Sequence, residues 1–410
     1  MKKREKKRPK IAIFGNFDTT NFGNDSTLKA VLYHLRRFQP DAEVTCICPW
    51  PNAISAAHHI RAILISEDFV KSWVPQNPAT RALRRILIGL PSEAIRWGKT
   101  FLSLRNTDML IVPGTGLLTD AYGLLGWGPL SLFKWSLIAK ICRCKLAFVS
   151  IGVGPINGTL GRFLVKSVLS WADFRSYRDN SSKQCLLDLG FAVQSDPVYP
   201  DLAFSLPELV IPQQSGHESN DRPSVGLGVM EASGAYDVLR QSNNYSVYLD
   251  KLVAFGEWLL AREYDVRLLS GDVCDEQAWQ EFSGRLRERS SDYDDARIFR
   301  QPIRSVDDLL LQIAATDVVV ATRFHNVLFA LFCNKPVISL SFHHKCASLM
   351  NAVGLSDYCF DINDYDAETL IEKLRALEKN ADKIKPLIKQ KVDGFREALD
   401  EQYRCIFDLV

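Results

Sequence analysis

The stretch that decides the fold is Asp317-Val-Val-Val-Ala-Thr-Arg-Phe-His-Asn-Val-Leu-Phe-Ala-Leu-Phe-Cys-Asn-Lys-Pro-Val-Ile-Ser-Leu-Ser-Phe-His-His-Lys345. Its first apolar run, Asp317 to Ala321, predicts a buried parallel strand. The apolar segment from Asn326 to Cys333 predicts a helix, and the run from Pro336 to Leu340 predicts a second strand. Buried strands joined by a helix are typical of an α/β protein with a parallel sheet.

Cationic side chains follow both of these predicted strands. Arg323 and His325 come after the first strand, and His343, His344 and Lys345 come after the second. Ligands of open α/β sheets bind at the carboxyl ends of the strands, and a helix N-terminus there favours anions. Each residue alone could be solvated or simply packed. Their joint position predicts a pocket for a phosphorylated or carboxylated ligand.

The alternation of strand and helix patterns runs through the whole chain and predicts an α/β fold with two Rossmann-like domains facing a cleft. A segment rich in Pro, Ser, Gly and Asn separates two α/β units of similar size. The expected parts are a basic N-terminal arm (1–9), an N-terminal Rossmann-like domain (10–204), a linker (205–223), a C-terminal Rossmann-like domain (224–365) and a closing helical tail (366–410).

Composition limits the classes of function. The 410 residues are 47% hydrophobic and 24% charged, the balance of a globular protein with sizeable cores. A net charge of +2 without a zinc-finger or RNA-binding signature argues against a nucleic-acid partner. The ten cysteines show no CxxC pair, so reduced thiols in a cytoplasmic protein are expected, and no metal site is assigned. No apolar run is long enough to span a bilayer.

Two segments are strongly basic. The first ten residues hold seven Lys or Arg and one Glu, without the apolar region of a signal peptide. A solubilising arm is expected, and attraction to an anionic membrane surface is the alternative. The segment Ala79–Arg105 mixes apolar residues with six basic residues and one acidic residue. It fits either helices at the inner face of a membrane or ordinary surface helices.

Three loops rich in small residues follow predicted strands of the first domain. They are Gly15 to Asp25, which includes Asn21; Pro113 to Leu117, which includes Gly114 and Gly116; and Ser150 to Pro155. Such loops on one sheet edge predict a binding crevice. They match neither GxGxxG nor a Walker A motif, so NAD binding is not supported.

Arg178 follows a further predicted strand of this domain. Arginine binds phosphate or carboxylate through two parallel hydrogen bonds, which favours a ligand contact. An ion pair with Asp179 or Asp201 is the structural alternative.

These motifs together resemble the polysaccharide pyruvyl transferase family, from Ile11 to about Gly354. The resemblance rests on Asn21-Phe-Gly-Asn-Asp25, the turn at Gly114 and Gly116, Ser150-Ile-Gly-Val-Gly-Pro155 and Tyr177-Arg-Asp-Asn-Ser181. Its most specific part is Arg323-Phe-His325, with Lys345 twenty positions after the histidine.

The resemblance implies a GT-B-like fold and transfer of a pyruvyl group from phosphoenolpyruvate to two sugar hydroxyls, giving a ketal and free phosphate. Phosphoenolpyruvate is then a donor substrate, and no cofactor is implied. Arg178, His325 and Lys345 are the positions expected to hold it. The acceptor is expected to be a sugar or glycan precursor, free or lipid-linked.

The chemistry of this reaction agrees with the residue types. His325 is the candidate general acid or base, or alternatively only a phosphate ligand. Arg178 and Lys345 would neutralise the departing phosphate, with Arg323 among the binding residues. Asp25 could orient an acceptor hydroxyl, although it could equally cap a helix. The alternative function is a GT-B glycosyltransferase that uses a nucleotide sugar.

Overall fold

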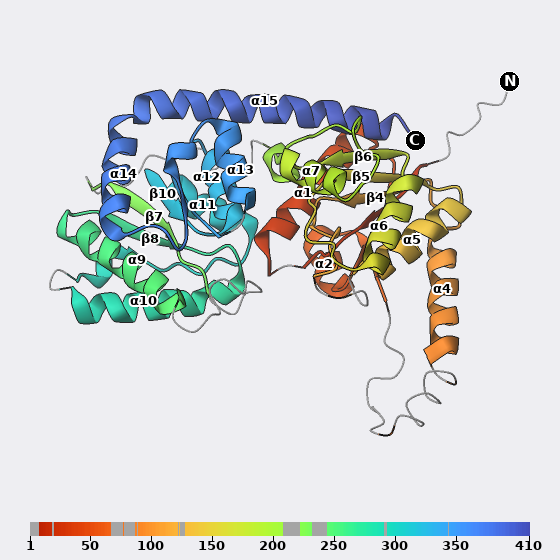
Figure 1. The fold of residues 1–410 in the computed structure, drawn as a ribbon, viewed down its shortest axis with the longest axis horizontal. Helices are drawn as coiled ribbons and strands as arrows, with labels where there is room; N and C mark the ends of the chain where they lie inside the picture. The colour runs from red at the N-terminus through yellow and green to blue at the C-terminus, as the bar shows by residue number, and fades with distance from the viewer. Residues whose placement is uncertain are drawn as a thin grey trace. The chain divides into compact units, whose positions relative to one another are not determined.

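The computed structural model describes residues 8–18, 20–66, 77, 87, 89–121, 123, 128–207, 222–231, 244–290, 293–342 and 344–410. Most of the expected basic arm and most of the expected linker lie outside these residues. The chain forms two compact units (Figure 1). Unit 1 comprises residues 1–19, 27–202 and 400–410, and unit 2 comprises residues 20–26 and 203–399. The short segment 20–26 therefore groups with the second half of the chain.

Unit 1 is built on a six-stranded parallel sheet of order β3-β2-β1-β4-β5-β6. Within it α5 packs against α4 and α6. The strands are β1 (Lys10–Phe14), β2 (Glu43–Cys48), β3 (Arg61–Leu64), β4 (Met109–Pro113), β5 (Lys145–Ile151) and β6 (Phe174–Tyr177). The helices are α1 (Phe22–Phe38), α2 (Pro51–His58), α4 (Leu90–Leu104), α5 (Pro129–Ile141), α6 (Thr159–Trp171) and α7 (Asn180–Asp188).

Unit 2 has a second parallel sheet, of order β12-β11-β10-β7-β8-β9. The strands are β7 (Ser224–Gly228), β8 (Asp265–Leu269), β9 (Ile298–Phe299), β10 (Val318–Ala321), β11 (Val337–Ser341) and β12 (Cys359–Asp361). The helices are α9 (Asn244–Ala261), α10 (Glu276–Arg289), α11 (Val306–Ala314), α12 (Phe324–Phe332), α13 (His344–Val353), α14 (Ala367–Lys379) and α15 (Ala381–Phe407). The last residues of α15 group with unit 1.

Both sheets have the same strand order. Counted within each unit, it is 3-2-1-4-5-6, the order of a Rossmann fold. The chain direction across such a sheet reverses between the first and fourth strands, which are β1 and β4 in unit 1 and β7 and β10 in unit 2. Ligands of this fold bind at the carboxyl ends of these strands. The expected fold of two Rossmann-like α/β parts is confirmed.

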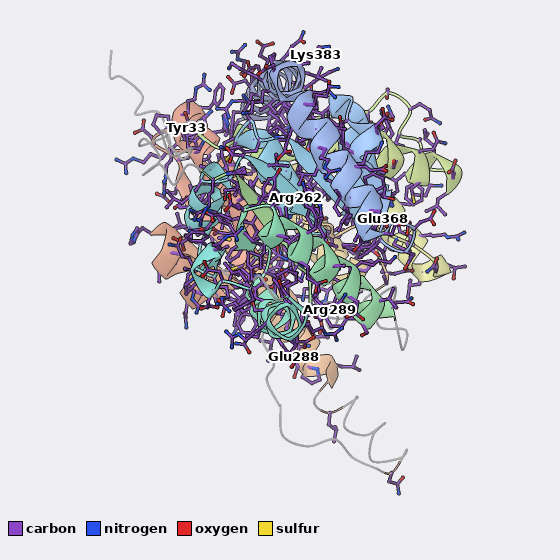
Figure 2. The ribbon with its side chains drawn as sticks, turned by 90° about the vertical axis from the view of Figure 1, so that its left-hand side faces the viewer. Tyr33, Arg262, Glu288, Arg289, Glu368 and Lys383 are labelled. Carbon is purple, nitrogen blue, oxygen red and sulfur yellow. The ribbon has the colours of Figure 1, made fainter. Side chains whose placement is uncertain are left out.

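The central strands are buried on both faces, which is why their sequences are continuous apolar runs. Every residue of β4, β7, β10 and β11 is buried. The helices of unit 2 carry charged side chains on their outer faces. Figure 2 shows examples that extend from the ribbon: Glu288 and Arg289 of α10, Glu368 of α14 and Lys383 of α15. Among the described residues, no helix is long and apolar enough to cross a membrane.

Candidate active site

The start of α12 places His325 at the carboxyl end of a central strand of unit 2. β10 ends at Ala321, and α12 begins at Phe324 with Arg323 as its extended N-cap residue. His325 is half-buried in the first helical turn. The unpaired backbone N–H groups of a first turn favour negative charge. The local sequence thus directs an imidazole and a positive helix end to the same edge of the sheet.

A loop from the beginning of the chain packs directly against this histidine. A Cβ atom built on Gly23 would lie 2.0 Å from Cε1 and 2.1 Å from Nδ1 of His325. Any side chain at position 23 would occupy the space of the imidazole, so only glycine fits there. The structure therefore brings together two sequence motifs separated by about three hundred residues.

Asn21 has a structural role in the same loop. Its Oδ1 accepts hydrogen bonds from the backbone N–H groups of Gly23 at 3.1 Å and Asn24 at 3.2 Å, and so caps the start of α1. Its Nδ2 donates to Asp272 at 3.3 Å. Asp25 is buried in the first turn of α1, where the helix dipole favours its carboxylate. Both predicted binding residues thus flank Gly23, the residue that packs against His325, and both serve the start of α1.

Arg323 is held by a buried carboxylate that the sequence analysis did not single out. Its Nε donates to Asp275 at 3.1 Å and its Nη2 donates to the same carboxylate at 2.6 Å. The Asp275 side chain is fully buried and also accepts from the backbone N–H groups of Glu231, Gly271 and Asp272. Burial raises the pKa of Asp275, while Arg323 and the N–H groups oppose that rise.

The same pair affects the arginine. Burial alone would lower the pKa of Arg323, but the charge and hydrogen bonds of Asp275 outweigh it and raise that pKa above its usual value. Two of the guanidinium nitrogens are thereby committed to Asp275. Arg323 therefore anchors the start of α12 to the loop after β8. In the structure Asp272 and Asp275 also form a capping box at this loop, which the sequence analysis did not identify.

Lys345 follows the neighbouring strand. β11 pairs in parallel with β10, and α13 begins at His344 just beyond its carboxyl end. Lys345 is half-buried in the first turn of α13, and His344 is exposed. His343 lies outside the described residues. Two adjacent parallel strands thus lead into two helix starts on one sheet edge, with an imidazole at one and an ammonium group at the other.

Asn326 is a second residue that sequence analysis missed. Its side chain is fully buried, and neither its amide oxygen nor its amide nitrogen has a hydrogen-bond partner within the described chain. A Cβ at Gly228 would lie 2.9 Å from Nδ2, and one at Gly271 would lie 3.1 Å from Oδ1. Asn326 therefore fills the space at the ends of β7 and β8, next to His325.

Arg178 belongs to unit 1. Its side chain is 8% exposed, and Nη1 donates to Asp201 at 3.1 Å while Nε lies 3.7 Å from Asp179. A Cβ at Gly152 would lie 2.5 Å from Nη2. Three predicted motifs, at Gly152, Arg178 and Asp201, thus meet around one arginine. The ion pair considered as the structural alternative is formed, and it orients the guanidinium.

The two glycines of the 113–117 loop serve the backbone. A Cβ at Gly114 would lie 2.3 Å from the carbonyl oxygen of Ser150, so two strand-end loops touch there. Gly116 has φ +66, a conformation that favours glycine. These contacts account for both glycines without a ligand, and their binding role stays a prediction.

No group of three or more His, Cys, Asp and Glu side chains that could hold a metal ion occurs within the described ranges. Unit 2 instead offers His325, Lys345 and two helix starts on one edge of its sheet. This arrangement suits an anionic ligand and a proton transfer at the imidazole.

The chain is similar to known proteins in sequence and in fold. Over nearly its full length the chain resembles the amylovoran biosynthesis protein AmsJ of Erwinia amylovora, at 20% identity over 94% of this chain and 96% of the relative. Its fold resembles the UDP-GlcNAc 2-epimerase of Neisseria meningitidis, with a TM-score of 0.60, 9% identity and coverage of 98% and 99% of the two chains. It also resembles a glycosyltransferase of Rickettsia africae, with a TM-score of 0.58, 14% identity and 98% coverage of each chain.

The two likenesses to solved structures are of fold alone, and they confirm the GT-B-like architecture. Residues 21–344 match the family model described as polysaccharide pyruvyl transferase. The matched region begins at the Asn21 loop and ends at the start of α13, and so includes every candidate site residue except Lys345. The chain belongs to the polysaccharide pyruvyl transferase family and is a transferase.

Proposed function

We propose that this protein transfers a pyruvyl group from phosphoenolpyruvate to two hydroxyls of one sugar in a polysaccharide or glycan precursor, free or lipid-linked, in the cytoplasm. The observation that carries the proposal is the pair of helix starts at β10 and β11, with His325 and Lys345 in their first turns. Phosphoenolpyruvate carries a phosphate and a carboxylate, which are the groups that such an edge favours.

The reaction needs one proton delivered to carbon and two bonds made to oxygen. Protonation of the methylene carbon of phosphoenolpyruvate makes C2 electrophilic, and one sugar hydroxyl adds to C2 and loses its proton. The C2–O bond to phosphate then breaks, and a second hydroxyl adds to C2 to close the ketal. The two hydroxyl protons balance the one on the new methyl group and the one on the released phosphate.

Each of these steps has a candidate residue in the proposed site. We assign to His325 the transfer of the proton, since histidine is the side chain that most often serves as general acid or base in proteins. Lys345 and the helix starts stabilise negative charge on the departing phosphate. Arg178 is assigned to the same reaction as an anion-binding group, oriented by Asp201. Asp25 and Asn21 shape the loop that sets the imidazole position, with Asp25 as a candidate contact for the acceptor.

The test is phosphate release from phosphoenolpyruvate in the presence of a panel of sugar and glycan acceptors. His325→Ala is expected to reduce turnover by about 10²–10⁴-fold, the usual contribution of a general acid or base. Arg178→Lys retains the charge opposite Asp201 but loses the planar contact, and it is expected to reduce turnover by about 10²-fold. Turnover that is unchanged in both variants would refute the assignment.

His59→Asn is the matched control. His59 is exposed in unit 1 at φ 54, a backbone conformation that asparagine tolerates. This variant should keep full turnover. Thermal-shift titration of the wild-type protein separates the two donor classes: stabilisation by phosphoenolpyruvate supports the proposal, and stabilisation by UDP or GDP alone would favour a nucleotide-sugar glycosyltransferase.

A further inference from the structure

Helix α4 of unit 1 exposes apolar side chains where a surface helix normally carries charge. Its inner side is packed: Thr100 and Leu104 are buried. Ile95 and Leu102, seven residues apart and so on one outer face of the helix, are 50% and 58% exposed, and Phe101 on its flank is 41% exposed. A helix with a single packed face should be polar on the opposite face. α4 therefore has a second apolar face, and no described element buries it.

The charge of α4 is positive. Its described charged residues, with the C-cap included, are Arg96, Lys99 and Arg105 against one acidic residue, Glu93. Lys99 is exposed, and Arg96 pairs with Glu93. Exposed apolar residues beside basic ones are the composition of a helix that lies in a membrane interface. A partner with negative headgroups complements this charge.

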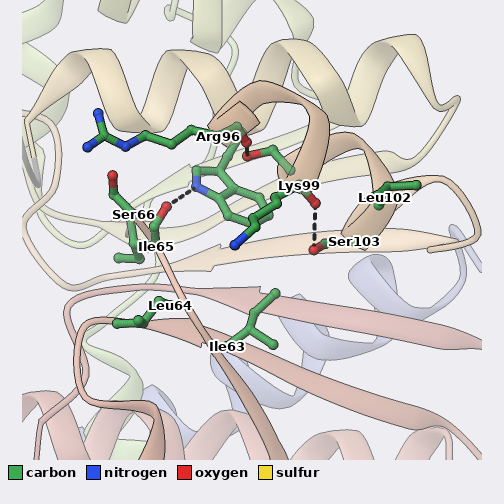
Figure 3. Close-up of a pocket in the computed structure, with 10 residues that line it drawn as sticks. Ile63, Leu64, Ile65, Ser66, Arg96, Lys99, Leu102 and Ser103 are labelled. Carbon is green, nitrogen blue, oxygen red and sulfur yellow. Dashed lines mark hydrogen bonds between the residues drawn. The ribbon is translucent and has the colours of Figure 1, made fainter. Parts of the chain in front are cut away.

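A pocket adjoins the helix. About 260 Å³ in volume, it lies between α4 and the end of β3 (Figure 3). Ile63, Ile65 and Trp135 give it apolar walls, while Lys99 and Ser103 are among its polar lining. In Figure 3 the Lys99 side chain extends from α4 toward the strand that carries Ile63 and Leu64.

Buried groups hold the walls of this pocket in place. The indole N–H of Trp135 donates to the carbonyl oxygen of Ile65 at 3.2 Å, which ties α5 to the chain after β3. The Thr100 hydroxyl donates to the carbonyl oxygen of Arg96 at 2.9 Å. Leu64, on the edge strand beside the pocket, is 42% exposed and extends the apolar surface beyond α4.

We propose that α4 docks unit 1 on the anionic surface of a lipid bilayer. Ile95, Phe101 and Leu102 enter the boundary between headgroups and acyl chains, and Lys99 contacts lipid phosphate at the mouth of the pocket. This surface lies wholly in unit 1, and docking through it does not depend on which donor the enzyme uses.

The test is co-sedimentation of the full chain with vesicles of phosphatidylcholine, alone or mixed with phosphatidylglycerol. Binding is expected only to the anionic vesicles and should weaken as salt screens the charges. Leu102→Glu and Lys99→Glu should each lower the vesicle-bound fraction about tenfold. Leu311→Glu is the matched control, because Leu311 is an exposed leucine (52%) on helix α11 of unit 2; its binding should equal that of the wild type.

Three outcomes would overturn the proposal. The wild-type protein could fail to bind anionic vesicles, or the vesicle-bound fraction could be the same for the wild type and all variants. Light scattering could instead show a dimer that Leu102→Glu separates without any vesicle binding, which would make this face a contact between copies of the chain. Thermal unfolding of each variant verifies folding, and phosphate release with a soluble acceptor should stay at the wild-type level in Lys99→Glu, so a failure of the reaction is recognised separately.

Discussion

The imidazole of His325 leaves no room for a side chain at position 23, which is glycine. A Cβ at this position would lie 2.0 Å from Cε1 of His325. We expect Gly23→Ala to displace the imidazole or the loop and to reduce turnover by about 10²-fold, as a shift of roughly 1 Å can do.

Gly284→Ala is the control, because a Cβ there meets no atom within 4 Å and the residue lies in helix α10. That variant should keep its activity and gain up to roughly 1 kcal/mol of stability. A Gly23→Ala enzyme with normal turnover would show that the loop yields without moving His325.

Asp275 is the second residue on which the site depends. Its fully buried carboxylate takes two hydrogen bonds from Arg323, so Asp275→Asn leaves a guanidinium poorly paired. We expect the free energy of unfolding to fall by about 3–5 kcal/mol, measured by urea denaturation. Joint replacement with Asp275→Leu and Arg323→Met should recover part of that loss, since neither charge remains buried alone. Full stability of Asp275→Asn would mean that the pair contributes little.

At the scale of elements, the site depends on helix starts. Asp179 caps α7 by accepting a hydrogen bond from the Ser182 N–H at 2.6 Å, and its other oxygen lies 3.7 Å from Nε of Arg178. Asp179→Ala should cost about 1 kcal/mol of stability, the usual value of an N-cap. Asp179→Ser keeps a capping oxygen and removes the charge, so it should recover most of that energy. Equal losses in both variants, by thermal or urea unfolding, would assign the stabilisation to the ion pair instead.

At the scale of the whole molecule, the last helix completes unit 1. Gln402 is fully buried, and its amide bonds the hydroxyls of Ser150 and Ser176. Gln402→Ala leaves the buried Ser150 hydroxyl without its amide partner, while the Ser176 hydroxyl keeps its bonds with the Ser150 N–H and the Phe148 carbonyl oxygen. The expected cost is about 1–3 kcal/mol in the free energy of unfolding. Gln390→Ala, an exposed position of the same helix, should have no measurable effect. Hydrogen exchange should locate the loss in the strands of unit 1, and a loss spread evenly over both units would contradict this assignment.

Much of the architecture followed from local sequence pattern. The apolar runs at Val318–Ala321 and Val337–Ser341 are strands as expected, because central parallel strands are buried on both faces. His325 and Lys345 follow these strands within a few residues, so their place at the sheet edge could also be predicted. Asp275 and Asn326 were not predicted as parts of the site, since nothing local marks an acid or an amide that will be buried by strands distant in sequence. The sequence pattern also could not predict that residues 20–26 group with unit 2.

The sequence by itself determined the two parallel sheets and the cationic ends of their strands, because hydrophobic periodicity and helix starts are set within about ten residues of the chain. Only the tertiary structure decided which distant groups meet there: Gly23 against His325, Asp275 with Arg323, and Asp201 with Arg178. Such pairings arise when whole sheets and loops pack, and the burial that makes them necessary is a property of the folded chain rather than of any segment.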